Sequence, residues 1–513
     1  ASHTFITGST GTGKSNAVYH LLDEITKNGQ TTFLVVEPAK GEYKNVFGNC
    51  TDVQVFGTNP RETPLLRMNP FAFPENIHIL EHIDRLVEIF NACWPMYAAM
   101  PAVLKDAIER SYQKVGWDLR NSESEKGVFP TFFDLLDILP GVIEESHYSK
   151  DTQSDYVGAL CTRVKSLTNG IYGSVLCAED ALTDEALFDR NVIVDLSRVG
   201  SMETKSLLMG ILVMKLQEYR MCSSGMNSRL RHVTVLEEAH NLLRKTSAEQ
   251  SQEGANLQGK SVEMLANAIA EMRTYGEGFI IADQAPGLLD MSVIRNTNTK
   301  IILRLPDEED RKLVGKSAAL KEAQIDELSK LPLGVAAVYQ NEWPEAVLCK
   351  IEAYPMPENA VYHKPSKMPH EINAEFVFGQ LAVGKELEPL SSSEMEQLKL
   401  WLKRHETVLK PEDSRYLERV FAGGELDVAK TRKAVFDFFG GIGTVVDYCA
   451  AAEKSFTPRK EFLEQLQGQY GLKAAAADWV LNSVISMGMS LNPDAKAVDN
   501  LRTNFERQGG RVL

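Results

Sequence analysis

Short apolar runs rich in β-branched residues alternate with amphipathic stretches along much of the chain. The first two runs, 3–7 and 32–36, flank a helix that is expected from Lys14 onward. Such alternation predicts a parallel sheet covered by helices, and these sheets bind ligands at the carboxyl ends of their strands. The pattern therefore predicts an α/β fold. The other expected strands are 191–196, 233–236, 279–282, 301–305 and 335–339.

The same pattern divides the chain into three expected parts. The strand runs fall in 1–59 and 191–355, the expected core, whereas 60–190 is mainly helical and rich in Leu, Ile and Phe. We interpret 60–190 as an insertion. Four prolines within 355–369 then interrupt helix formation. Beyond them the helical period continues without strand runs, so 370–513 is predicted to be a small α-helical domain.

Local signals refine this picture at three places. A capping box formed by Ser393 and Glu396 predicts a helix over 394–403, and a proline at the first helical position predicts another over 459–467. The segment 245–260 is polar and rich in Gly, Ser and Gln, so we expect a loop there.

Composition sets limits on the class of protein. The 513 residues are 43% hydrophobic, enough for two or three cores, and the seven cysteines form no C-x-x-C pair. No run approaches the roughly 18 uncharged apolar residues of a membrane span. We therefore expect a cytoplasmic protein that does not enter the membrane. A net charge of −15 excludes a surface that coats nucleic acid, but not a narrow basic channel.

The first chemical signal is the segment GSTGTGKS, which ends at Lys14 and Ser15 and fits G-x-x-x-x-G-K-[ST] between an expected strand and helix. Its glycines let backbone N–H groups surround phosphates, Lys14 would reach the β- and γ-phosphates, and Ser15 would hold Mg²⁺. The segment predicts binding of ATP with Mg²⁺. The expected nucleotide-binding residues are Gly8, Thr10, Gly11, Thr12, Gly13, Lys14, Ser15 and Asn16.

The second signal is HVTVLEEAH, an apolar run that ends in Glu237 and Glu238. Neighbouring residues of a strand point in opposite directions, so one acid can hold Mg²⁺ while the next deprotonates the attacking water. We assign Glu237 to the metal and Glu238 to the base. Alone, such a pair is more often a solvated helix start; its place downstream of the phosphate loop favours the catalytic interpretation. His240 either bonds a neighbouring carboxylate or caps the next turn.

The order of these segments resembles the HerA/FtsK family of hexameric P-loop ATPases, which includes type IV secretion motors. The resemblance covers about residues 3–351 and is carried by GSTGTGKS, EPAKGEY, LEEAHNLL and AEMRTYGEGFIIADQAP. It implies a RecA-like core of the additional-strand class with ATP and Mg²⁺ at the interfaces of a homo-hexamer, and DNA moving through the central pore.

The resemblance also implies roles for residues outside the two motifs. Gln284 would sense the γ-phosphate, Arg273 would be an arginine finger donated to the neighbouring subunit, and Arg304 is a second basic candidate. The alternatives are that Arg273 is a solvated residue of an expected helix, 262–275, and that Arg304 makes a structural ion pair within the expected strand 301–305.

Three features depart from the family pattern. The element after the second strand has Glu37 in place of Asp and one extra residue, and Asp283 replaces the small hydroxyl residue common before the sensor glutamine. The β-barrel that precedes the P-loop in HerA proteins is also not in this sequence. Because Ala1 lies almost on the first expected strand, we expect a preceding piece to be missing.

The predicted function is thus ATP-driven DNA translocation of the HerA type. The family implies a partner effector, a nuclease or a sirtuin-like protein, in DNA processing or anti-phage defence. Two alternatives stay open: an ATP-regulated ring scaffold that controls an effector, and a motor related to type IV secretion.

Overall fold

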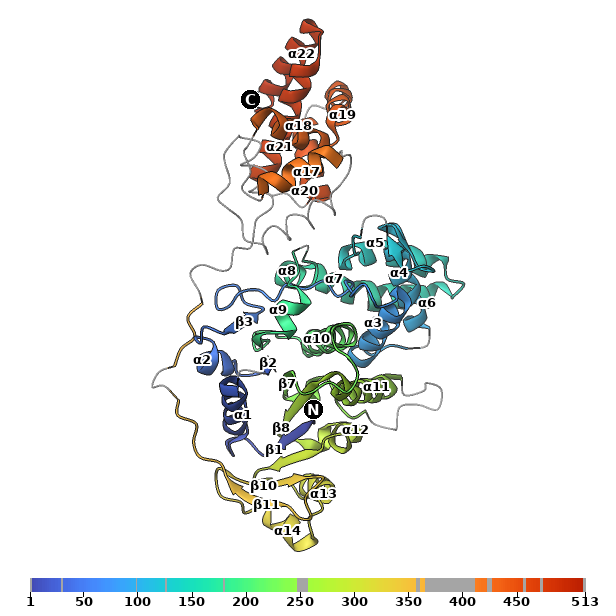
Figure 1. The fold of residues 1–513 in the computed structure, drawn as a ribbon. Coiled ribbons are helices and arrows are strands. Elements are labelled where there is room, and N and C mark those ends of the chain that lie inside the picture. Colours follow the sequence, from blue (N-terminus) through green and yellow to red (C-terminus); the bar gives the residue numbers. More distant parts are fainter. Residues whose placement is uncertain are drawn as a thin grey trace. The chain divides into compact units, whose positions relative to one another are not determined.

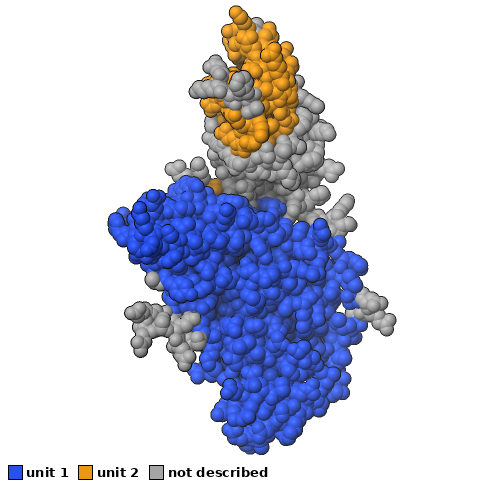
Figure 2. All heavy atoms as spheres, turned by 180° about the vertical axis from the view of Figure 1, so that it is seen from behind, with its two compact units in different colours: residues 1–125, 129–366 blue, residues 126–128, 367–513 orange. Residues whose placement is uncertain are grey.

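The computed structural model forms two compact units, residues 1–125 with 129–366 and residues 126–128 with 367–513 (Figures 1 and 2). Each is described by itself. The residues whose structure is described are 2–28, 31–97, 99–124, 127–178, 180–246, 257–356, 360–364, 411–421, 427–454, 458–470 and 474–510.

The first unit is built on a nine-stranded sheet in the order β11-β10-β9-β1-β8-β7-β2-β6-β3. All neighbours pair in parallel as far as β9, and β10 and β11 pair antiparallel at one edge. The strands are β1 (Thr4–Thr7), β2 (Thr32–Glu37), β3 (Val53–Gly57), β6 (Asn191–Asp195), β7 (His232–Glu237), β8 (Glu277–Asp283), β9 (Thr299–Ile302), β10 (Val335–Gln340) and β11 (Val347–Lys350).

Alternating side chains of each central strand fill two separate cores. In β2, Phe33 and Val35 pack in one core, whereas Leu34 and Val36 pack in the other. This is the period-two pattern of a strand buried on both faces. The first core is closed by α1 (Lys14–Asn28) and α2 (Tyr43–Phe47), and the second by α3 (Ile79–Cys93), α10 (Met202–Ser223) and α11 (Leu257–Glu271) (Figure 1).

Helices supply most of the chain between β3 and β6. A short antiparallel pair, β4 (Trp117–Asp118) and β5 (Glu123–Ser124), lies among them. Their buried side chains belong to the same core as α10 and the sheet, so they pack onto the sheet layer. After α3 the helices are α4 (Met100–Lys114), α5 (Phe132–Glu145), α6 (Lys150–Tyr156), α7 (Thr162–Thr168), α8 (Gly170–Leu176) and α9 (Asp184–Phe188).

The second unit is helical and has its own core, which includes Phe436, Tyr448 and Leu481. Among the described helices, none is both long and apolar enough to cross a membrane by itself. The segments Ala429–Phe438 and Gly441–Ala452 meet that test only as a pair bent by 63°. The helices are α17 (Pro411–Phe421), α18 (Val428–Phe438), α19 (Gly441–Lys454), α20 (Pro458–Tyr470), α21 (Ala474–Leu491) and α22 (Ala495–Arg507).

The parallel sheet and the helical C-terminal region confirm the predicted fold class. Four strands were not predicted: β3, which lies at one edge of the sheet, β11, whose side chains are largely exposed, and the short pair β4 and β5. The expected strand 301–305 begins and ends too far along the sequence, because β9 spans Thr299–Ile302. The expected helix 459–467 lies within α20, and the expected boundaries of core, insertion and C-terminal domain stay predictions.

Two other expectations fall partly or wholly outside the described residues. Of the expected loop 245–260, residues 247–256 are not described, and 257–260 belong to α11 because Leu257 already begins the helix. The expected helix 262–275 is α11 followed by a 3₁₀ turn, Met272–Tyr275. The expected helix 394–403 lies outside the described residues.

Candidate nucleotide site

The phosphate loop follows β1 directly and adopts a conformation that requires glycine. Gly11 and Gly13 have φ angles of 75° and 109°, where a side chain is strained. A Cβ at Gly8 would lie 2.7 Å from Cβ of Leu303, so the residue that follows β9 also restricts this position. The Lys14 ammonium donates to the Gly8 carbonyl at 2.6 Å, which folds its side chain across the loop. Partial burial lowers the pKa of this amine.

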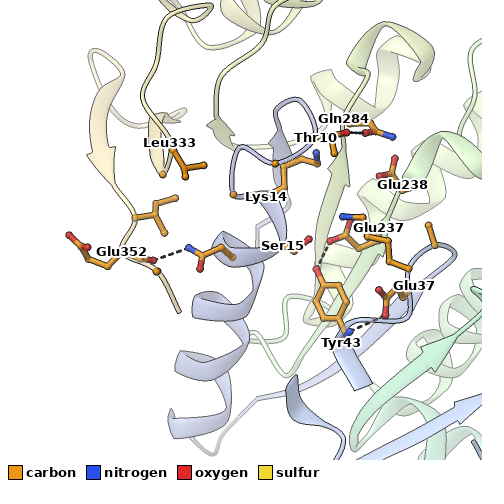
Figure 3. Close-up of a pocket in the computed structure, with 18 of the residues that line it drawn as sticks. Thr10, Lys14, Ser15, Glu37, Tyr43, Glu237, Glu238, Gln284, Leu333 and Glu352 are labelled. Carbon is orange, nitrogen blue, oxygen red and sulfur yellow. Dashed lines mark hydrogen bonds between the residues drawn. The ribbon is translucent and has the colours of Figure 1, made fainter. Parts of the chain in front are cut away.

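The loop opens onto a cavity of about 450 Å³ that brings together both sequence motifs (Figure 3). Glu237 and Glu238 come from the end of β7, and Gln284 follows the end of β8. The Thr10 hydroxyl donates to Gln284 Oε1 at 2.7 Å, so the predicted sensor already contacts the phosphate loop. The lining residues are Thr10, Gly11, Gly13, Lys14, Ser15, Asn16, Glu37, Ala39, Lys40, Tyr43, Glu237, Glu238, Gln284, Leu333, Gly334, Lys350, Ile351, Glu352 and Ala353.

Two of the predicted nucleotide-binding residues, Gly8 and Thr12, do not line the cavity and shape the loop instead. The Thr12 hydroxyl donates to the Ser9 carbonyl at 2.7 Å. Ser15 and Glu237, the two expected Mg²⁺ residues, both line the cavity. Hydroxyl and carboxylate oxygens are the ligands that Mg²⁺ prefers, so this pair fits the ion.

Tyr43 is a functional residue that the sequence analysis did not identify. Its fully buried hydroxyl donates to the carboxylate of Glu237, and burial raises the pKa of Glu237 to about 7. The signal was present in the sequence, because Tyr43 ends the EPAKGEY element that follows β2. Parallel strands bring that element to the same edge of the sheet as Glu237.

Glu37 stabilises the turn of the same element. Its two carboxylate oxygens accept from the backbone N–H groups of Glu42 and Tyr43 at 2.7 and 3.1 Å. Lys40 and Gly41 make the turn with φ angles of 64° and 69°. Burial outweighs these hydrogen bonds and raises the pKa of Glu37 to about 8. Glu37 is thus a further titratable carboxyl in the lining of the pocket, beside Glu237.

The second departure, Asp283, does not hold Gln284 through its side chain. It lies at the end of β8, and its carboxylate accepts from the main-chain N–H and the Nδ1 of His240, at 2.8 and 2.9 Å. This contact raises the pKa of His240. His240 therefore bonds a neighbouring carboxylate, one of the two roles the sequence allowed.

Two segments that are distant in sequence complete the cavity opposite Glu237 and Glu238. One precedes β10 and includes Leu333, and the other, which we call the strap, follows β11 and includes residues 351–353. Asn16 fastens the strap: its amide donates to the Glu352 carbonyl at 2.8 Å and accepts from the Tyr354 N–H at 2.7 Å. The side chain of Asn16 is thus committed to the strap although the residue lines the pocket. No sequence signal linked these segments to the P-loop.

The described lining of the cavity includes neither predicted arginine. Arg273 is exposed in the turn before β8, at the amino end of the strands, whereas the phosphate loop is at their carboxyl end. Arg304 is exposed just after β9; its backbone carbonyl accepts from the Ser9 N–H at 3.0 Å. Within one chain the structure brings neither guanidinium into the cavity.

Comparison with known proteins agrees with this arrangement. The model for the central domain of helicase HerA matches residues 1–215. A DNA double-strand break repair helicase HerA of Sulfolobus acidocaldarius is 26% identical over 69% of this chain, and a probable helicase of Methanocaldococcus jannaschii is 22% identical over 69%. The chain spans 65% and 66% of their lengths. The resemblance to the HerA/FtsK family is confirmed.

Solved structures show the fold of this HerA-like chain. VirB4 of Thermoanaerobacter pseudethanolicus aligns with a TM-score of 0.53 at 19% identity and covers 69% of this chain and 90% of VirB4. The conjugative coupling protein TrwB aligns with a TM-score of 0.50 at 14% identity and covers 71% of this chain and 88% of TrwB. The unit that holds the cavity therefore has the RecA-like P-loop ATPase fold.

The raised pKa of Glu37 predicts how stability depends on pH. Between its usual pKa of 4.5 and about 8, the unfolded chain releases this proton while the folded chain keeps it. Stability from this group therefore falls as pH rises, by at most about 1.4 kcal/mol per pH unit. Glu37→Gln should lower the thermal midpoint of nucleotide-free protein at pH 5, with the deficit shrinking by pH 8. Glu42→Gln, at an exposed position, is the control; parallel curves for both variants would contradict the assignment.

Proposed function

We propose that the chain is a subunit of an ATP-hydrolysing ring that translocates DNA in the manner of HerA. The observation that supports this most is the convergence of Lys14, Glu237, Glu238 and Gln284 on one cavity. TrwB, which shares the fold, has been solved in complex with a non-hydrolysable ATP analogue. The relative from Sulfolobus acidocaldarius bears the description of a helicase for DNA break repair.

The residues predicted from the two motifs, together with Gln284, each have a chemical task in this proposal. Backbone N–H groups of the loop and the Lys14 ammonium bind the phosphates, and Glu238 accepts the proton of the water that attacks the γ-phosphate, so that ADP and phosphate leave. Mg²⁺, held through Ser15 and Glu237, would neutralise charge on the β- and γ-phosphates. Gln284, already bonded to Thr10, would report whether the γ-phosphate is present.

Lys14→Ala and Glu238→Gln should both abolish turnover but differ in binding. Lys14 supplies charge to the bound phosphates, so its loss weakens nucleotide affinity. Glu238 acts on water, so its glutamine variant should lose roughly 10²- to 10⁴-fold in kcat while it retains ATP. The measurements are steady-state phosphate release and binding of a fluorescent ATP analogue. Normal turnover by either variant would refute the ATPase assignment.

The position of Arg273 supports a ring. A cation that stabilises the transferred phosphoryl group must reach it, and in one chain Arg273 lies at the opposite end of the strands. A neighbouring subunit that presents its Arg273 to this cavity would complete the site and couple hydrolysis to subunit movement. We propose a homo-hexamer on the basis of the family resemblance.

Mixing two inactive variants tests the sharing of Arg273. In a ring that contains both Arg273→Ala and Lys14→Ala subunits, some interfaces join an intact Lys14 to an intact Arg273, so part of the activity should return. Neither homogeneous ring has such an interface. The measurement is ATPase rate against mixing ratio, with subunit exchange followed by fluorescence transfer. Exchanged rings that stay inactive would leave Arg273 a solvated residue of its turn.

Binding of DNA should be confined to the pore. The chain has 70 acidic and 55 basic residues, so its exterior repels phosphate and only a few pore-facing cations per subunit contribute. We expect affinity to fall steeply with salt, little preference among duplex sequences, and faster hydrolysis when DNA is bound. The measurement is a salt titration on unrelated duplexes with ATPase rate in parallel. A rate indifferent to DNA at low salt would favour the ring scaffold over the motor.

The remaining parts of the proposal rest on the family resemblance. They are a cytoplasmic location, an effector partner of the nuclease or sirtuin-like class, and a role in DNA processing or anti-phage defence. The likeness to VirB4 and TrwB concerns the fold, which translocases and secretion motors share, so it does not favour the secretion alternative.

A further inference from the structure

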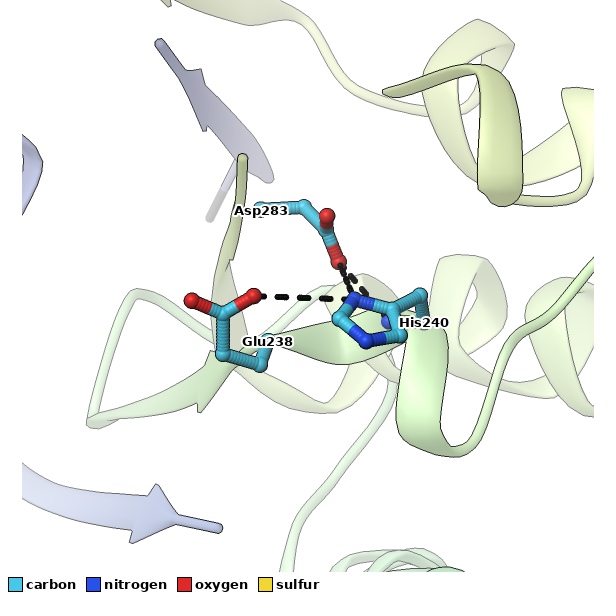
Figure 4. Close-up of side chains that lie close together, drawn as sticks. All are labelled: Glu238, His240 and Asp283. Carbon is cyan, nitrogen blue, oxygen red and sulfur yellow. Dashed lines mark hydrogen bonds and ion pairs between the residues drawn. The ribbon is translucent and has the colours of Figure 1, made fainter. Parts of the chain in front are cut away.

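Three titratable side chains, one of them the lining residue Glu238, lie close together (Figure 4). Glu238 precedes the 3₁₀ turn Ala239–Asn241 that follows β7, His240 lies within that turn, and Asp283 is the last residue of β8. The His240 Nδ1 lies 2.9 Å from Asp283 Oδ2 and 3.6 Å from Glu238 Oε2. One imidazole nitrogen therefore faces two carboxylates.

Asp283 fixes the orientation of this imidazole. The carboxylate is fully buried, and its Oδ2 accepts from both the main-chain N–H and the Nδ1 of His240. Its Oδ1 accepts from the Ala285 N–H at 2.9 Å. Both oxygens are thus committed as acceptors, and the contact to Oδ2 places the imidazole proton on Nδ1. Asp283 therefore holds His240 at two points, one on its main chain and one on its side chain.

Glu238 has a strained backbone and a carboxylate oxygen that, within the described part of the chain, lacks a hydrogen-bond donor. Its backbone is in the left-handed region with φ of 44°, a strained conformation for a residue with a side chain. Its Oε2 is buried and, among the described residues, has no hydrogen-bond partner. A buried carboxylate oxygen without a donor is costly. The Nδ1–H of His240 donates to Asp283, and Nδ1 lies 3.6 Å from this Glu238 oxygen, so a small rotation of the Glu238 carboxylate would let the two carboxylates share that hydrogen.

We propose that Asp283 and His240 are positioning residues for the catalytic base, in which Asp283 orients His240 so that its Nδ1–H, shared between the two carboxylates, holds the Glu238 carboxylate toward the γ-phosphate. The inference rests on the proposed function, since it assumes that Glu238 is the base. It also gives a role to the departure at position 283. A small hydroxyl there would lack the second acceptor that here binds Ala285 while the first holds the ring.

A metal ion is the competing occupant. One atom from each side chain lies within 4.8 Å of the other two, a histidine and carboxylate set that Zn²⁺ also accepts. Coordination through Nδ1 would require the lone pair where the contact to Asp283 places a proton. The hydrogen-bond geometry therefore favours positioning, and the metal is an outcome of the test.

The test uses His240→Ala and His240→Asn in the full chain. Removal of the imidazole should lower kcat roughly 10- to 100-fold, the scale seen when the group behind a catalytic side chain is lost. Affinity for a fluorescent ATP analogue should stay within about twofold, because Lys14 and the phosphate loop are untouched. Asparagine offers an N–H near the position of Nδ1 and should restore much of kcat. His363→Ala, an exposed histidine outside the cavity, is the matched control.

A double-mutant cycle tests whether Asp283 affects kcat through His240. Asp283→Asn should lower kcat in the native chain but change it less than about twofold in the His240→Ala background, since the imidazole it orients is gone. Thermal unfolding checks the fold of each variant. If Asp283→Asn does not fold, the two His240 variants carry the test by themselves.

Each remaining outcome overturns the inference. If Asp283→Asn lowers kcat by the same factor in the native chain and in His240→Ala, Asp283 does not act through His240 and is a structural residue only. Equal loss of kcat and affinity in His240→Ala, or no rescue by asparagine, would show that His240 supports the pocket and not the base. Turnover that a zinc-selective chelator removes and Zn²⁺ restores, with Mg²⁺ in excess, would establish a metal site. A native chain that hydrolyses no ATP overturns the proposed function and this inference together, whereas normal turnover by His240→Ala overturns the inference alone.

Discussion

Four neighbouring strands of the sheet, β8, β7, β2 and β6, each end in a buried carboxylate at the carboxyl end of the sheet. The site depends on how the fold accommodates these four groups. Burial of an unpaired carboxylate is costly, so each requires a donor or a cation. Asp195 pairs with Lys44 at 2.6 Å, and the other three carboxylates accept hydrogen bonds from groups beside the pocket. The contacts that stabilise this end of the sheet are therefore the same contacts that orient the catalytic groups. The carboxylates are Asp283, Glu237, Glu37 and Asp195.

The part of the site that could be predicted from the sequence is set by the order of motifs and strands along the chain. A strand, a glycine-rich loop and a helix follow one another, and Glu237 ends an apolar run, so parallel pairing brings them together. The strap was not predictable, because Asn16 and Glu352 are far apart in the chain and meet through main-chain carbonyls that any sequence supplies. Strand β3 was missed for a related reason: at Val53–Gly57 it is short and lies at an edge, where periodicity is weak.

The cavity is complete for binding but incomplete for catalysis within one chain. Lys14 and the loop can hold phosphates, and Glu238 can take a proton, yet no described arginine lines the cavity to stabilise charge on the transferred group. Arg273 is held by its own turn at the far end of the strands. A single chain of this geometry would bind nucleotide more readily than it hydrolyses it. In the proposed ring, assembly would therefore control turnover.

The departure at position 283 shows how the fold accommodates a buried carboxylate where the family pattern has a small hydroxyl residue. In place of a small hydroxyl, this chain buries a carboxylate, which must be bonded fully to be tolerated. Those bonds come from Ala285 and His240, and they place the imidazole of His240 beside the strained Glu238. In the proposed mechanism, the histidine that satisfies Asp283 therefore also positions the base, because one imidazole faces both carboxylates.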